Sequence, residues 1–167
     1  RPRMEITRKT DYALRMVAEL IRSESGVMSV RSAAQRNDVP YSFARSIQHD
    51  LVRAGIVESL RGSHGGMRLA VDPAATSLLR VVEAVQGSVC FSGCDTAGEG
   101  DTPCPRMGSC PYNPVWGGVT RILRDYLASV TLLDVVTGSR APSLPARYAQ
   151  PGAFDGLRGA IAESLEA

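Results

Sequence analysis

A short helix, a tight turn, a second helix and a glycine-rich hairpin follow one another between residues 29 and 71, and this order constrains the fold most strongly. The segment "SVRSAAQRNDVP" contains two helical turns that must stop before Pro40, because proline cannot continue a helix. The segment "YSFARSIQHDLVRAG" then predicts a helix with Ser42 at its N-cap. Its expected apolar face consists of Phe43, Ile47, Leu51 and Val52.

The residues after this second helix predict a small β wing. "IVESL" and "MRLAV" alternate in polarity on either side of "RGSHGG", which is typical of a hairpin. Two helices, a tight turn and a hairpin together predict a winged helix-turn-helix, whose second helix enters the DNA major groove. The expected fold class is therefore mainly α with a small β wing, joined to a long dimerisation helix.

This module supplies the candidate DNA-binding residues. Polar side chains on the second helix suit base contacts, and wing glycines let the backbone approach a narrow minor groove. Residues 1–70 carry 12 basic and 7 acidic side chains, whereas residues 71–167 carry 7 basic and 10 acidic ones. The basic half therefore favours a polyanion partner. The predicted DNA-binding residues are Ser29, Arg31, Tyr41, Ser42, Arg45, Gln48, His49, Arg61, Gly62, Ser63, His64, Gly65 and Gly66.

Helical patterns flank the module on both sides. Residues 7–24 show three-to-four apolar spacing, with Thr7 or Thr10 as the expected N-cap. Thr76 or Ser77 is expected to cap a short helix before Gly87.

Between residues 114 and 137 an apolar stripe extends over about six turns. Its expected partner is the same helix of a second subunit, and the alternative is packing on the first helix of the same chain. The stripe consists of Val115, Val119, Ile122, Tyr126, Val130 and Leu133.

These patterns predict four regions along the chain. They are a winged-helix DNA-binding domain at 4–73, a short helix with a cysteine-rich loop at 74–113, a long dimerisation helix at 114–137, and a loosely ordered tail at 138–167. The apolar runs are too short to cross a membrane, and the beginning of the sequence lacks the apolar core of a secretory signal. We therefore expect a cytoplasmic protein with no membrane partner.

All four cysteines lie between residues 90 and 110. A disulfide, a zinc site and an iron-sulfur cluster are the three chemistries open to them. Reducing conditions in the cytoplasm disfavour a permanent disulfide. The intervals of three, nine and five residues fit the paired spacing of structural zinc sites less well. A reversible disulfide that joins Cys90 or Cys94 to Cys104 or Cys110 remains an alternative, as does zinc.

Enzyme classes find little support in the sequence. It contains no phosphate-binding glycine loop and no nucleophile elbow, and the two histidines both lie in the expected DNA-reading module. We therefore predict that the protein is not an enzyme.

Several stretches resemble one known family in order along the chain. "MEITRKTDYALRMVAEL", "VPYSFARSIQHDLVRAGIVESLRGSHGGMRLA", "VVEAVQG", the cysteine loop and "VWGGVTRILRDYLASVTLLDVV" are similar to the IscR/NsrR/CymR family of dimeric winged-helix bacterial regulators. The resemblance covers residues 4–136. It implies a homodimeric transcriptional regulator, with a repressor favoured, that binds double-stranded operator DNA and senses nitric oxide, redox state or iron supply through an iron-sulfur cluster held in the 90–110 loop.

The resemblance also implies a ligand set. Cys104 and Cys110 keep the interval between the family's second and third cysteines, and Cys90, followed by an aromatic residue, resembles the first. Cys94 is an alternative or additional ligand. Asp11, in "TDYALR", matches the position from which nitric-oxide-sensing members supply an aspartate of the partner subunit. A four-iron four-sulfur cluster is favoured over a two-iron two-sulfur cluster.

Overall fold

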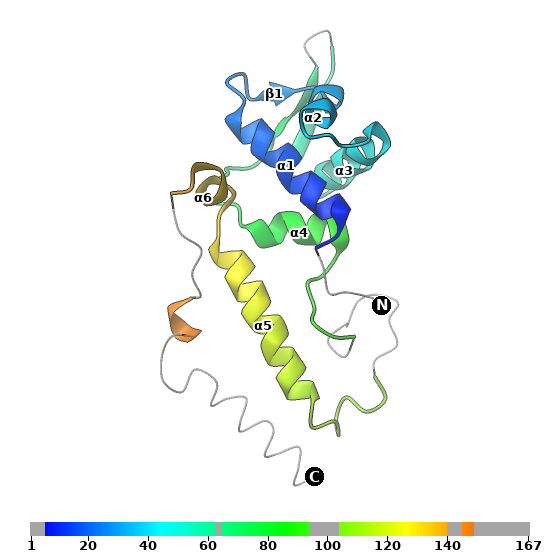
Figure 1. The fold of residues 1–167 in the computed structure, drawn as a ribbon, viewed down its shortest axis with the longest axis vertical. Coiled ribbons are helices and arrows are strands. Elements are labelled where there is room, and N and C mark those ends of the chain that lie inside the picture. Colours follow the sequence, from blue (N-terminus) through cyan, green and yellow to red (C-terminus); the bar gives the residue numbers. More distant parts are fainter. Residues whose placement is uncertain (1–5, 63–64, 94–103, 140–144, 149–167) are drawn as a thin grey trace. The chain divides into compact units, whose positions relative to one another are not determined.

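A computed structural model of the protein describes residues 6–62, 65–93, 104–139 and 145–148. The chain separates into two compact units (Figure 1). The first contains residues 1–87 and 130–141, and the second contains residues 88–129 and 142–167. Ser63, His64 and Cys94, three of the predicted site residues, lie outside the described residues, as does most of the predicted tail.

The first unit is helical with one small sheet (Figure 1). Its elements are α1 Arg8–Arg22, β1 Val27–Met28, α2 Val30–Arg36, α3 Tyr41–Arg53, β2 Val57–Leu60, β3 Gly66–Leu69, α4 Leu78–Gln86 and α6 Leu132–Thr137. Helix α4 packs against both α1 and α3, and α6 packs against α1. The fully buried side chains at the centre include Met16, Ile47, Leu51, Ile56 and Met67. The predicted fold class, a winged helix-turn-helix, is confirmed.

Side-chain hydroxyls fix where three helices begin. Thr7, Ser29 and Ser77 each accept a hydrogen bond from the backbone N–H three residues later. The expectation for Ser42 is wrong, because α3 already begins at Tyr41 and Ser42 lies inside its first turn. Pro40 takes the N-cap position, and its carbonyl accepts the Ala44 N–H at 3.1 Å.

Three strands form the sheet, in the order β1-β3-β2 with antiparallel pairing. Sequence alternation predicted the β2–β3 hairpin, but the two-residue β1 is too short to give such a signal. The absence of a side chain at Gly66 lets β1 approach β3, because a Cβ there would lie 2.7 Å from the Met28 carbonyl oxygen. Across the hairpin, Glu58 faces Arg68, and their side chains form an ion pair.

The buried face of α3 differs from the predicted one. Ala44, Ile47 and Leu51 are fully buried, whereas Phe43 is 44% exposed and Val52 is 39% exposed. Spacings of three and four place residues 44, 47 and 51 on one stripe, and the small Ala44 lets α3 approach its neighbours. The Phe43 ring instead meets Tyr12 of α1 edge-on, with centroids 6.1 Å apart.

The single helix predicted over residues 114–137 is in fact two helices, α5 Asn113–Ser129 and α6 Leu132–Thr137. Thr131 stops the first and caps the second, because its hydroxyl accepts the Asp134 N–H while the Asp134 carboxylate accepts the Thr131 N–H. The Leu132 N–H donates to the Thr76 carbonyl at 2.9 Å. This break places α6 in the first unit and leaves α5 in the second.

The described part of the second unit contains α5, the segments 88–93 and 104–112, and a short 3₁₀ helix, Ala146–Tyr148. The Tyr148 hydroxyl donates to the Asp125 carboxylate, which joins the 3₁₀ helix to α5. In the part of the chain that the structure describes, no helix is both long and apolar enough to cross a membrane.

Candidate nucleic-acid interface and cysteine segments

The turn between α2 and α3 is fixed by local hydrogen bonds. The Asn37 side-chain amide donates to the Ala33 carbonyl at 2.9 Å, and the Val39 N–H donates to the Ala34 carbonyl at 2.9 Å. Between them Asp38 takes a positive φ of 53°, a conformation that short polar residues tolerate. The buried Val39 then anchors the turn in the core. These contacts hold the turn that joins the two helices.

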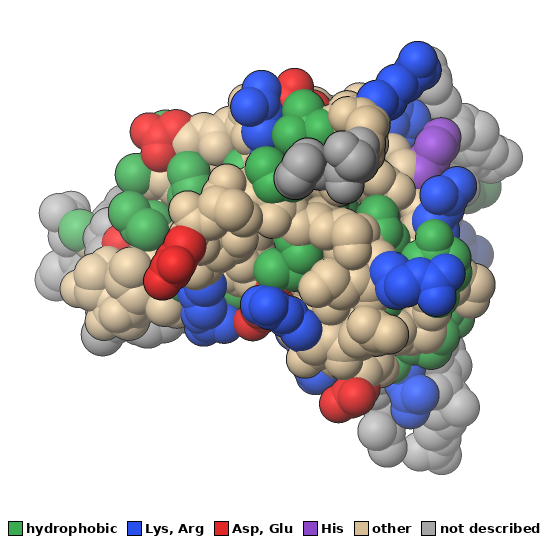
Figure 2. Space-filling view, turned by 90° about the horizontal axis from the view of Figure 1, so that it is seen from above, with side chains coloured by type: hydrophobic (Ala, Val, Ile, Leu, Met, Phe, Trp, Pro, Cys, Tyr) green, Lys and Arg blue, Asp and Glu red, His purple; other side chains and the backbone are tan. Residues whose placement is uncertain are grey.

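The outer face of α3 carries the residues that sequence predicted for DNA contact. Tyr41, Ser42, Arg45 and His49 are exposed, opposite the buried stripe that contains Ile47. In Figure 2, Lys and Arg side chains are spread over the view, and a histidine side chain lies beside some of them at the right. The exposed arginines of α2, α3 and the wing are Arg31, Arg36, Arg45, Arg53, Arg61 and Arg68.

Gln48 has a partner inside the protein. Its side chain is half-buried, and its Nε2 donates to the Ser59 hydroxyl on β2 at 3.1 Å. Sequence predicted Gln48 as a base-reading residue, and that role stays a prediction. The structure adds a direct hydrogen bond between α3 and the wing, which sequence spacing could not reveal.

Two predicted DNA contacts at α2 also have neighbours in this chain. The Ser29 hydroxyl accepts the Ser32 N–H at 3.0 Å, so it serves as the N-cap of α2. The Arg31 guanidinium lies over the Tyr41 ring, 5.2 Å from its centroid. This cation–π contact orients Arg31 at the junction of α2 and α3.

Glycines determine the shape of the wing. Gly62 has a φ of +106°, which favours glycine strongly. The Gly65 N–H donates to the Gly62 carbonyl at 2.9 Å, and a Cβ on Gly65 would lie 2.5 Å from the Leu60 carbonyl oxygen. Arg61 is exposed beside this turn. The described part of the wing therefore presents a cation next to a backbone that tolerates close approach.

The position of α3 is also fixed by an ion pair. This pair was not predicted from the sequence. Lys9 Nζ of α1 lies 2.5 Å from the Asp50 carboxylate, which is 13% exposed. Arg53 and His49 nitrogens lie 3.8 and 3.9 Å from the same carboxylate. The pair joins residues 41 positions apart, so no local pattern signals it.

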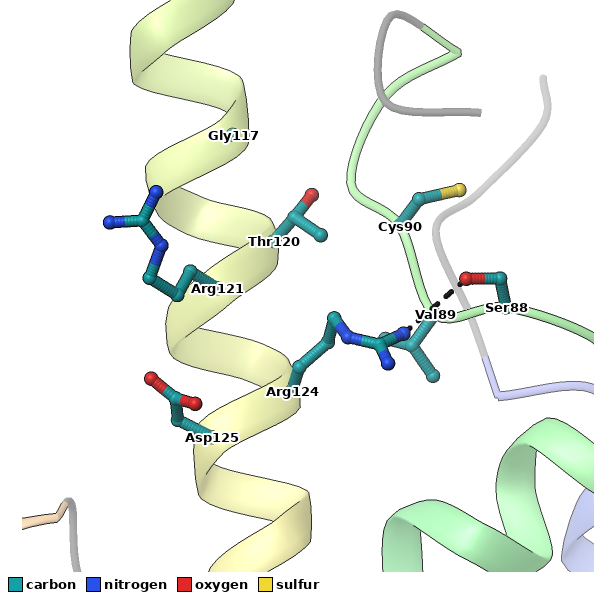
Figure 3. Close-up of a pocket in the computed structure, with 8 residues that line it drawn as sticks. All are labelled: Ser88, Val89, Cys90, Gly117, Thr120, Arg121, Arg124 and Asp125. Carbon is teal, nitrogen blue, oxygen red and sulfur yellow. Dashed lines mark hydrogen bonds between the residues drawn. The ribbon is translucent and has the colours of Figure 1, made fainter. Parts of the chain in front are cut away.

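Cys90 belongs to a segment that runs along α5. Its thiol is free and half-buried. Cys90 lines a pocket of about 500 Å³ together with Ser88, Val89 and residues of α5 (Figure 3). The next residue, Phe91, donates its N–H to the Thr120 hydroxyl at 2.9 Å. Arg124 reaches from the helix to Ser88, with 3.3 Å between Nη1 and Oγ (Figure 3).

Cys104 and Cys110 stand at the two ends of a compact turn before α5. Both thiols are free and half-buried. The Met107 N–H donates to the Cys104 carbonyl at 3.0 Å, and the Asn113 N–H donates to the Cys110 carbonyl at 3.2 Å. The Asn113 side-chain amide also donates to the Met107 carbonyl at 3.1 Å. Asn113, the first residue of α5, thereby holds both halves of the turn.

The chemistry of these donors fits an iron-sulfur cluster. Clusters bind thiolate sulfur, and three free, partly exposed thiols are present in one unit. No three histidine, cysteine or acidic side chains are gathered as a metal site among the described residues, which exclude Cys94. The structure thus supplies suitable donors on two anchored segments, without an assembled site.

Asp11 lies in the first turn of α1 and is half-exposed. Its carboxylate lies 2.7 Å from the Arg15 guanidinium, one turn later. An i,i+4 pair of this kind stabilises a helix by only a few tenths of a kcal/mol, about 0.2–0.5. The carboxylate therefore remains accessible to other partners.

Comparison with known proteins identifies the family. Residues 6–138 match the Rrf2 family, described as iron-dependent transcriptional regulators. Protein aau3 of Rhizobium meliloti is 31% identical over 133 residues, covering 80% of this chain and 85% of that protein. The transcriptional regulator IscR of Vibrio cholerae is 29% identical over 134 residues, covering 80% of this chain and 75% of that protein.

A solved structure supports the same fold. The structure of CymR, the global cysteine regulator of B. subtilis, aligns with a TM-score of 0.63 at 24% identity, covering 83% of this chain and all of that one. The family model and IscR are described as transcriptional regulators and not as enzymes, in agreement with the sequence-based prediction. The chain belongs to the Rrf2 family of DNA-binding transcriptional regulators.

Proposed function

We propose that this regulator is a cytoplasmic homodimer whose binding to operator DNA is controlled by an iron-sulfur cluster on the cysteine segments. The observation that carries the proposal is the set of three free, half-buried thiols, Cys90, Cys104 and Cys110, on two segments attached to α5. Family membership supplies the DNA-binding role, and these thiols supply the means to control it.

The DNA-binding part of the proposal rests on the exposed face of α3. Arg45 and His49 project from the middle of this helix, and Arg45 has no hydrogen bond or ion pair recorded within the described residues. An arginine with a free guanidinium can donate two hydrogen bonds to one guanine in the major groove. Arg61 and the wing glycines would follow the neighbouring minor groove, and Arg31 would contact phosphate.

The dimer part rests on α5. Val115, Val119, Ile122 and Tyr126 repeat along this 17-residue helix, and all four are only partly buried in the single chain. Half-exposed apolar side chains at helical spacing suit packing against the same helix of a second copy. A two-fold dimer would also present two α3 helices to the two halves of a palindromic operator.

The cluster part assigns thiolate ligands to Cys90, Cys104 and Cys110, with Cys94 as an alternative or additional ligand. The remaining position would be taken by Asp11 of the partner subunit. A bound cluster, for which the four-iron four-sulfur form is favoured, supplies iron that reacts with nitric oxide or oxygen. An oxygen donor such as a carboxylate is released from iron more readily than a thiolate, which suits a repressor that must respond to a signal.

A thiol switch is the second candidate, and the partial exposure of the three thiols favours it. Two cysteines would lose two electrons and two protons to an oxidant such as a peroxide and form one disulfide. This chemistry requires no metal. The third candidate is a regulator in which the same thiols bind zinc.

Anaerobic purification followed by iron and sulfide analysis tests the proposal. We expect the wild-type chain to contain both, with a visible absorption band, and Cys104→Ala and Cys110→Ala to lose them while remaining folded. Ser109→Ala is the matched control, because it changes the residue beside Cys110 without removing a thiol. A colourless wild-type protein that contains zinc, or only a reversible disulfide, would replace the cluster with one of the alternatives.

A further inference from the structure

The two cysteine segments are attached to α5 through separate contacts. Segment 88–93, which contains Cys90, is held by the Thr120 hydroxyl and by Arg124. Segment 104–112, which contains the other two described thiols, is held by Asn113. Thr120 and Asn113 lie seven residues apart, about two helical turns along the same helix.

One aromatic ring joins these two attachments. Trp116 stacks on Phe91, with centroids 5.4 Å apart and an interplanar angle of 27°. It also stacks on Tyr112, with centroids 6.5 Å apart and an angle of 24°. Phe91 follows Cys90 directly and Tyr112 comes two residues after Cys110, so a single ring contacts the neighbours of both outer thiols. Stacked pairs of this kind stabilise packing beyond the area that they bury.

We infer that the first half of α5 is a scaffold with two independent anchors, Thr120 for the Cys90 segment and Asn113 for the Cys104–Cys110 turn, which Trp116 connects. These three side chains are positioning residues, since none of them is a thiol. The scaffold orders the flanks of the cysteines before any ligand binds, so that ligand binding has less conformational entropy to overcome. The inference rests on the proposed function only for the identity of the group that the thiols bind.

The burial of the unit supports this role. Gly118 is the only buried residue of α5, so the segments are not held by a packed apolar core around them. The directional contacts with Thr120, Arg124 and Asn113 therefore contribute to their order. Thr120 and Asn113 act on backbone groups, which fixes the path of the chain and not merely the place of one side chain.

Hydrogen-exchange mass spectrometry on the full-length, reduced, metal-free chain tests the two anchors in a crossed design. Thr120→Val keeps the side-chain shape and removes the acceptor for the Phe91 N–H. We expect exchange in segment 88–93 to become about fivefold faster, the factor typical of one lost hydrogen bond, with segment 104–112 unchanged. Asn113→Ala should have the opposite pattern.

Trp116→Ala should accelerate exchange in both segments, and Trp116→Phe, which keeps a ring, should restore much of the protection. Arg121→Ala is the matched control, since this exposed neighbour of Thr120 makes no recorded hydrogen bond to either segment in the described chain. The inference is overturned if Thr120→Val and Asn113→Ala leave both segments unchanged. It is also overturned if either variant accelerates both segments and α5 equally, because the anchors would then not be independent.

Iron retention after reconstitution with ferrous iron and sulfide separates this inference from the proposed function. If wild-type protein retains no iron but shows the crossed exchange pattern, the scaffold stands and the cluster proposal fails. If wild-type protein retains iron and the crossed pattern is absent, the scaffold inference fails alone. With both correct, Thr120→Val should lose iron several times faster than Arg121→Ala.

Discussion

The two units of this protein differ in how they bury their side chains. The first unit has a continuous core built from α1 to α4, the sheet and α6. In the second unit, Gly118 is the only buried residue among those that the structure describes. A folded core explains the first unit without any partner. The second unit has ordered segments and a half-exposed apolar helix, an arrangement that the proposed second copy and the proposed cluster would complete.

The largest expected effect concerns the core of the first unit. Leu51→Ala removes a fully buried side chain of α3 and should lower the free energy of unfolding by about 2–5 kcal/mol. Urea denaturation followed by circular dichroism measures this change. Val52→Ala, at the adjacent and exposed position, should cost less than about 1 kcal/mol. Equal losses for both variants would contradict the burial difference between them.

The next effect concerns the apolar stripe of α5. Ile122→Lys places a charge in the proposed dimer interface and should raise the dimer dissociation constant at least about a hundredfold, or about 2.8 kcal/mol. Analytical ultracentrifugation across a concentration series gives this constant. Ala128→Lys, at an exposed position of the same helix, is the control. A wild-type chain that is monomeric at micromolar concentration would remove the dimer explanation for the exposed stripe.

Base reading by the first unit predicts a smaller change. Arg45→Ala should weaken binding to an operator selected from a random duplex library by about 1–3 kcal/mol, because it removes contacts to a base edge. Fluorescence anisotropy at fixed salt measures the affinity. A base contact also predicts that the variant discriminates less at one operator position. Unchanged affinity and unchanged discrimination would exclude Arg45 from the interface.

The smallest predicted effect concerns the link between α3 and the wing. Gln48→Ala and Ser59→Ala should each weaken operator binding by about 0.5–1.5 kcal/mol, and the double variant should lose no more than either single one. Such non-additivity is expected if the hydrogen bond orients the wing. A loss that is specific to one operator base, and that appears only in Gln48→Ala, would instead assign Gln48 to base reading.

Local sequence signals predicted the first unit well. The cap at Ser29, the break at Pro40 and the alternation around the wing each act within a few residues, so they can be read directly from the sequence. The predicted face of α3 was partly wrong, because Phe43 and Val52 are apolar but the close approach of neighbouring elements selects Ala44 for the core. Hydrophobicity alone cannot distinguish a small buried residue from a large exposed one.

The long helix shows another limit of local reading. The apolar repeat continues through residues 129–133, but the polar pair Thr131 and Asp134 forms a capping box that starts a new helix. The capping signal is present in the sequence, but the apolar repeat across it favoured one continuous helix. The break allows Val130 and Leu132 to be buried, which a straight helix would not provide.

By itself, the sequence determined the fold class, the order of the DNA-binding elements and the presence of four clustered thiols, because these depend on residue type and short spacing. Only the tertiary structure decided which residues meet across long separations. Examples are Lys9 with Asp50, Gln48 with Ser59, and Phe91 with Thr120 and Trp116. Such contacts depend on how whole elements pack against one another, and this packing is set by the shape of many side chains together and not by any local pattern.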